Sequence, residues 1–227
     1  MKTNTATHRP DAETDRNGDV PSFDLGTDRP ADAGNVLTSP VFMAKLVSGE
    51  VRITLPGILA ACATENLVDF PAVRTHQAHT VHMFLAHLYA LASEMIPEGS
   101  DLSDEATWRE SLLNIEPDGG AGIWDIVGVS DDAPAFMQPA VPQGLVLKNV
   151  ERTPSAIDLL VTANEHVTKS LKSGDYDDEI WIWHLITLQT GAGFPGRGNY
   201  GCFRMNGGFS SRSLWAVYDR SWSMGRR

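Results

Sequence analysis

Glycine and arginine are concentrated in one stretch near the end of the sequence, "GAGFPGRGNYGCFRMNGGFSSRS" (residues 191–213). Glycine reaches positive φ and lets the backbone approach a ligand closely. Arginine presents a planar fork of donors that fits phosphates and base edges. Residues 191–227 contain six arginines and one acidic residue, Asp219. The pattern therefore predicts a loop that contacts an anionic ligand.

Nucleotide and hydrolase motifs fit this stretch poorly. Gly191, Gly193 and Gly196 match the letters of GxGxxG, but they follow a predicted helix, whereas the dinucleotide fingerprint follows a strand. The sequence contains neither a Walker loop nor the GxSxG nucleophile elbow. Asn206-Gly207 favours a tight hairpin turn, which is compatible with a neighbouring contact loop. We predict no catalytic residues and no cofactor.

Histidines on one predicted helix form a pattern that could bind a metal. His76, His79 and His87 would lie within about 80° of each other around such a helix, and imidazoles suit transition metals. HExxH is absent, and no nearby cysteine or evident acidic ligand completes a site. Solvated or capping histidines are the expectation, and a metal-binding enzyme stays as an alternative.

Composition limits the possible partners. The 227 residues carry a formal net charge of −11, and 42% of them are hydrophobic. An acidic chain with a basic end disfavours a DNA-binding surface that covers the whole molecule, and it favours a local contact with a polyanion or docking onto a basic partner. Only Cys62 and Cys202 are cysteines, and no apolar run suggests a membrane span or a secretory signal. A cytoplasmic location is expected.

Hydrophobic periodicity and turn residues predict a mixed α+β fold of helices and short antiparallel strands. Residues 1–34 read as a disordered acidic tail, and residues 35–227 as one domain. Thr75 and Ser103 are the expected caps of two helices. The expected elements are a hairpin over 41–55, helices over 55–65, 75–96, 105–115, 153–166 and 179–194, a strand over 123–128, and an irregular loop over 131–144.

Four pieces of the sequence, in this order, resemble the CasA family, the large subunits of type I-E CRISPR Cascade complexes. They are the hairpin that runs into "LPGILAACATENLVDFPAVRTHQAHTVHMFLAHLYALA", then "PAFMQPAVP", then "TPSAIDLLVTANEHVTK", and last "LITLQTGAGFPGRGNYGCFRMNGGFSSRS". The resemblance covers roughly residues 36–213. Family members are longer and end in a helical bundle, and nothing after Ser213 resembles that continuation.

The resemblance implies an antiviral role in RNA-guided recognition and no reaction. A CasA-like N-terminal domain would contact target double-stranded DNA near the protospacer-adjacent motif (PAM) and bind other Cascade subunits, crRNA and the helicase-nuclease, while base pairing with the guide reads most of the sequence. The implied DNA-binding residues are Gly193, Phe194, Gly196 and Gly198, to which we add Arg197 and Arg204 from their chemistry. The implied guide-RNA or subunit contacts are Asn164, His166, Lys169 and Lys172.

A third function class remains open. A stand-alone protein could use its acidic surface to cover a basic partner, and it would not need the glycine-rich stretch for binding.

Overall fold

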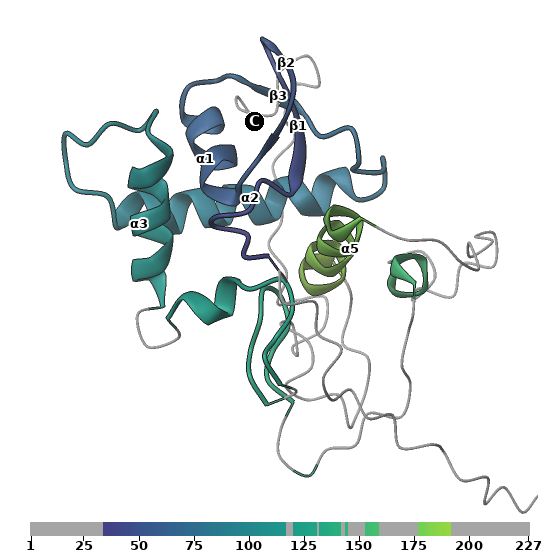
Figure 1. Ribbon diagram of the computed structural model, residues 1–227. Helices are drawn as coiled ribbons and strands as arrows, with labels where there is room; N and C mark the ends of the chain where they lie inside the picture. Colours follow the sequence, from purple (N-terminus) through teal and green to yellow (C-terminus); the bar gives the residue numbers. More distant parts are fainter. Residues whose placement is uncertain are drawn as a thin grey trace, which may run out of the picture. The chain divides into compact units, whose positions relative to one another are not determined.

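The computed structural model describes residues 34–116, 120–130, 132–141, 144, 153–158 and 177–191, all within one unit of the chain, Asp32–Arg227. A small sheet packs with α-helices around one hydrophobic core (Figure 1). The mixed α+β class predicted from the sequence is therefore confirmed for this part of the chain. The elements in chain order are β1 (Phe42–Leu46), β2 (Gly49–Ile53), α1 (Leu55–Ala63), β3 (Leu67–Asp69), α2 (Ala78–Glu94), α3 (Glu105–Ile115), the 3₁₀ helices η2 (Ala121–Trp124) and η3 (Pro154–Ile157), and α5 (Asp178–Gly191).

The sheet has the order β2-β1-β3 and is antiparallel throughout. The predicted hairpin is confirmed, with Phe42 opposite Ile53 and Leu46 opposite Gly49. Gly49 has φ +135°, a backbone conformation that residues other than glycine rarely adopt, so glycine suits this turn. Strand β3 was not expected, because it is only three residues long and directly precedes the breaker Phe70-Pro71.

One threonine fixes the start of α1 and connects it to α3. The Thr54 side chain accepts a hydrogen bond from the Gly57 N–H at 3.0 Å, which caps the first turn. The same hydroxyl donates to Glu105 Oε1 at 2.8 Å, in the first turn of α3. Helix α3 begins and ends where the periodicity predicts, but its cap is Asp104, which accepts from the Ala106 N–H, and not Ser103.

Helix α2 starts later than its sequence pattern predicts. The predicted cap Thr75 lies in a turn, and the helix begins at Ala78 after Gln77. The Gln77 side chain folds back to accept a hydrogen bond from the Arg74 N–H at 3.0 Å. Residues 74–77 therefore form a separate turn, and His76 lies outside the helix on which it was expected.

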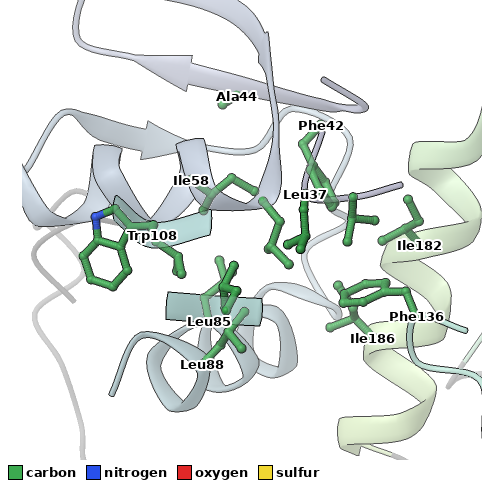
Figure 2. Packing of buried hydrophobic residues seen from close by; sticks show 14 of the residues in the cluster. Leu37, Phe42, Ala44, Ile58, Leu85, Leu88, Trp108, Phe136, Ile182 and Ile186 are labelled. Carbon is green, nitrogen blue, oxygen red and sulfur yellow. The ribbon is translucent and has the colours of Figure 1, made fainter. Parts of the chain in front are cut away.

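The core lies between the helices and one face of the sheet. Figure 2 shows Ile58 of α1, Leu85 of α2 and Ile186 of α5 among the buried side chains of one cluster. Phe42 of β1 and Phe70 contact the Trp183 ring of α5, with ring centroids 5.0 and 4.9 Å away. Burial of these side chains supplies the main driving force for folding.

Two expected elements differ from the structure. Of the strand predicted over 123–128, the first two residues belong to the 3₁₀ helix η2, and only Asp125 makes a β-bridge, with Asn35. The helix predicted from Thr153 starts as the 3₁₀ turn η3, and Asp158 leaves it with φ −60° and ψ 139°. The strand prediction rested on a short apolar run, which does not distinguish a strand from a helical turn. The predicted helix is also wrong at Asp158, where no α-helix continues.

Among the described residues, no helix has the length and apolar character needed to cross a bilayer. The predicted irregular loop is confirmed for its described part, residues 132–141, which contains a single bridge between Ala135 and Gln138.

The core predicts the effect of truncating two leucines of α2. Leu85 is 4% exposed and Leu91 is 52% exposed. Leu85→Ala should lower the free energy of unfolding by about 2–5 kcal/mol, because it leaves a cavity. Leu91→Ala should change it by less than about 0.5 kcal/mol. Urea unfolding followed by tryptophan fluorescence measures both, and equal losses would contradict the described core.

Candidate functional site

The site residues implied by the resemblance lie outside the described residues. This holds for both groups, namely Gly193, Phe194, Gly196, Arg197, Gly198 and Arg204, and also Asn164, His166, Lys169 and Lys172. The described chain stops before each group, at Asp158, six residues before Asn164, and at Gly191, two residues before Gly193. What the structure adds is how these two points are held.

Asp158 is a buried carboxylate with three basic side chains around it. Arg74 Nη1 donates to its Oδ2 at 3.2 Å. His76 Nε2 lies 3.0 Å from Oδ1 and 3.1 Å from Oδ2. His184 Nε2 lies 3.2 Å from Oδ2. The Asp158 side chain is only 3% exposed, and we call these four residues the Asp158 cluster.

The cluster joins three parts of the chain that are distant in sequence. Arg74 and His76 come from the turn before α2, Asp158 directly follows η3, and His184 lies in the middle of α5. Helix α5 packs against both α2 and η3. A buried carboxylate needs donors to replace lost water, so Asp158 fixes η3 against both neighbours.

His184 has acceptors at both ring nitrogens. Its Nδ1 lies 2.8 Å from the Ile180 carbonyl oxygen, one helical turn earlier, while its Nε2 faces Asp158. A neutral imidazole carries one N–H and can donate to only one of them. Burial lowers the pKa of His184, and the Ile180 carbonyl and the Asp158 carboxylate oppose that effect. The neutral ring is therefore the favoured form at neutral pH.

A second buried carboxylate attaches the start of α5 to the sheet. Glu179 Oε1 accepts from the Met43 N–H of β1 at 2.9 Å and from Trp183 Nε1 at 3.0 Å. Strand β3 pairs with β1 only at Lys45 and Leu46, so it does not reach the Met43 amide. Burial raises the pKa of Glu179, and these two donors oppose the shift. The carboxylate thus takes the place of a strand partner.

The histidine pattern considered as a metal site has a different arrangement. His76 lies before α2 and contacts Asp158, whereas His79 is exposed and His87 half-buried on the helix. In the described part of the chain, no three His, Cys, Asp or Glu side chains are placed to hold a metal ion. The three-histidine metal site is therefore not formed by these residues.

Sequence reasoning did not identify the Asp158 cluster. Asp158 lies within the "TPSAID" piece of the resemblance, which implies no role for it, and the helix pattern around His184 predicts no partner for this side chain. One signal was available: a histidine within "IWIWHLI" and an aspartate after "PSAI" are polar residues in apolar surroundings, and buried polar groups need partners. Their pairing depends on tertiary contacts, so the sequence did not reveal it.

The cluster predicts a difference between two aspartates that both bind arginine. Asp158→Ala removes the carboxylate that the buried His184 ring shares with the half-exposed Arg74, and it should cost about 1–3 kcal/mol of unfolding free energy because a buried polar group loses its partner. Asp177 binds Arg52 with both side chains 43% exposed, so Asp177→Ala should cost less than about 1 kcal/mol. Chemical denaturation compares them. Similar costs would show that the Asp158 cluster contributes little.

Glu179 predicts a pH dependence of stability. Its pKa is raised in the folded chain above 4.5, so the folded chain binds this proton more tightly than the unfolded chain does. The resulting stabilisation is present at acid pH and is lost as the pH rises through the folded-state pKa. The unfolding free energy of the wild type minus that of Glu179→Gln should therefore fall as the pH rises above 4.5, the ordinary pKa of a glutamate.

Denaturation at matched ionic strength measures this difference, and Glu50→Gln at an exposed position on β2 controls for the loss of one negative charge. A difference that rises with pH would contradict the burial described here.

Comparisons of the chain with protein-family models, with curated proteins and with solved structures each found no match. Membership of the CasA family therefore stays a prediction from the residues.

Proposed function

We propose that this chain is a CasA-like, non-catalytic subunit of a crRNA-guided surveillance complex, which contacts target duplex DNA beside the protospacer-adjacent motif. Its partners would be the other Cascade subunits, the guide RNA and the helicase-nuclease that degrades the target. The glycine-rich segment after α5 would make the DNA contact, and the segment after Asp158 would meet the guide or a neighbouring subunit.

The Asp158 cluster is the observation that carries this proposal. Three pieces of sequence that resemble CasA, "VRTHQAH", "TPSAID" and the start of "LITLQTG", lie in or beside the cluster. These pieces are far apart in the sequence, and in the described structure they lie at or next to one site. This placement also means that both candidate contact segments are connected to positions held by one buried carboxylate.

Charge distribution supports a local DNA contact. Residues 35–190 contain 21 acidic and eight basic side chains, whereas residues 191–227 contain six basic side chains and one acidic one. Duplex DNA would be repelled by most of the chain and attracted by the end that follows α5. Glycine without side chains suits approach to a minor groove about 6 Å wide, and arginine adds contacts to phosphates or to the groove.

A duplex-binding experiment tests the proposal. The full chain is titrated against a fluorescent DNA duplex with randomised flanks over a series of salt concentrations. The wild type should bind, with an affinity that falls linearly on a logarithmic salt scale. Arg197→Gln and Arg204→Gln should each weaken binding and reduce the slope by about 0.9 for each lost phosphate contact.

Lys45→Gln is the matched control, since it removes one positive charge from an exposed position on strand β1. Gly196→Asp adds a side chain and a negative charge to the predicted contact and should abolish binding. Binding that is absent, or unchanged in all three segment variants, would contradict the proposal. Absence of duplex binding together with retention on a basic protein partner would favour the acidic interaction protein instead.

A further inference from the structure

We propose that the Asp158 cluster is a proton-sensitive joint, which holds residues 153–158 against α5 and the turn before α2 while His184 is neutral and loosens when His184 takes up a proton. This inference does not depend on the proposed function, because it concerns only the four side chains and the elements that carry them.

Charge balance is the first argument. At neutral pH the cluster contains the Arg74 guanidinium and the Asp158 carboxylate, with the neutral His184 ring beside them. When His184 takes up a proton, its ring and Arg74 place two positive charges on one carboxylate. Like charges within a few ångströms repel each other, and a single carboxylate cannot compensate both.

Burial is the second argument, and it applies to His184 in particular. The His184 side chain is 2% exposed, whereas that of His76 is 25% exposed and that of Arg74 is 44% exposed. The Arg74 and His76 side chains reach solvent in the closed joint, but an imidazolium at His184 does not. Water reaches it only if the joint opens, so protonation of His184 favours opening.

The groups around His184 come from every element that forms the joint. Asp158 after η3 favours the protonated ring, and Arg74 before α2 disfavours it. His76 shares the same carboxylate, and the Ile180 carbonyl of α5 accepts at Nδ1. Burial exceeds the two favourable contacts and lowers the pKa of His184 below its ordinary value of 6.5.

Linkage gives the sign of the effect. In the open joint the His184 ring is exposed and has a pKa of about 6.5, while in the closed joint its pKa is lower. The closed joint is therefore fully favoured above about pH 6.5 and loses stability as the pH falls toward the closed-state pKa. For one proton, the opening equilibrium rises by up to about tenfold for each pH unit in this window.

Hydrogen exchange at two amides reports the opening directly. The Ala156 and Asp158 amides donate to the Thr153 and Ser155 carbonyls in η3. Their exchange, corrected for the intrinsic pH dependence, should speed up on acidification in the wild type. His184→Gln should remove this dependence, while His76→Gln and the control His87→Gln on α2 should retain it. A dependence that survives in His184→Gln, or disappears only in His76→Gln, would overturn the proposal.

An NMR titration of the histidine rings needs no variant. In the wild type the His184 ring should titrate below about 6.5. In Asp158→Asn, which removes the carboxylate that favours the imidazolium, it should titrate lower still. A His184 ring that titrates above its ordinary value would show that the proton strengthens the joint instead. A His184 pKa that Asp158→Asn leaves unchanged would show that the two side chains are not coupled, which would also overturn the proposal.

Discussion

Buried carboxylates and the donors they require determine how α5 is held in this protein. An ionised carboxylate without water must find donors, and it finds them wherever the fold can bring them. Glu179 binds an amide of β1, and Asp158 is bound by His184 of the same helix. The apolar side of α5, with Ile182 and Ile186, packs into the core, but apolar packing has no preferred direction. The hydrogen bonds of the two carboxylates therefore determine the position of the helix along its neighbours.

The two carboxylates also connect the core to the segments on which the proposed function depends. The chain leaves the described structure at Asp158 and at Gly191, and each point belongs to an element held by a buried polar contact. A contact loop gains precision when its ends are fixed to rigid elements. In the proposed joint, the buried His184 makes this attachment dependent on pH, which an attachment made of apolar contacts alone would not be.

Regular elements could be predicted from the sequence where the local pattern is strong. The hairpin and the helices α1, α3 and α5 follow from hydrophobic spacing, since each buries one face against the same core. The misses occur where competing partners exist. Thr75 does not cap α2 because Gln77 binds the preceding backbone, and Asp104 takes the position expected for Ser103. The strand β3 is stabilised by pairing with β1, a contact that a three-residue pattern cannot reveal.

By itself, the sequence determined the α+β class, the positions of most helices and the separation of an acidic chain from a basic end, because these depend on residue type and local spacing. Only the tertiary structure decided that Arg74, His76 and His184 meet at Asp158. Hydrogen bonds of buried groups are satisfied across distances in sequence that no local pattern encodes, so the identity of the partners depends on how the helices pack.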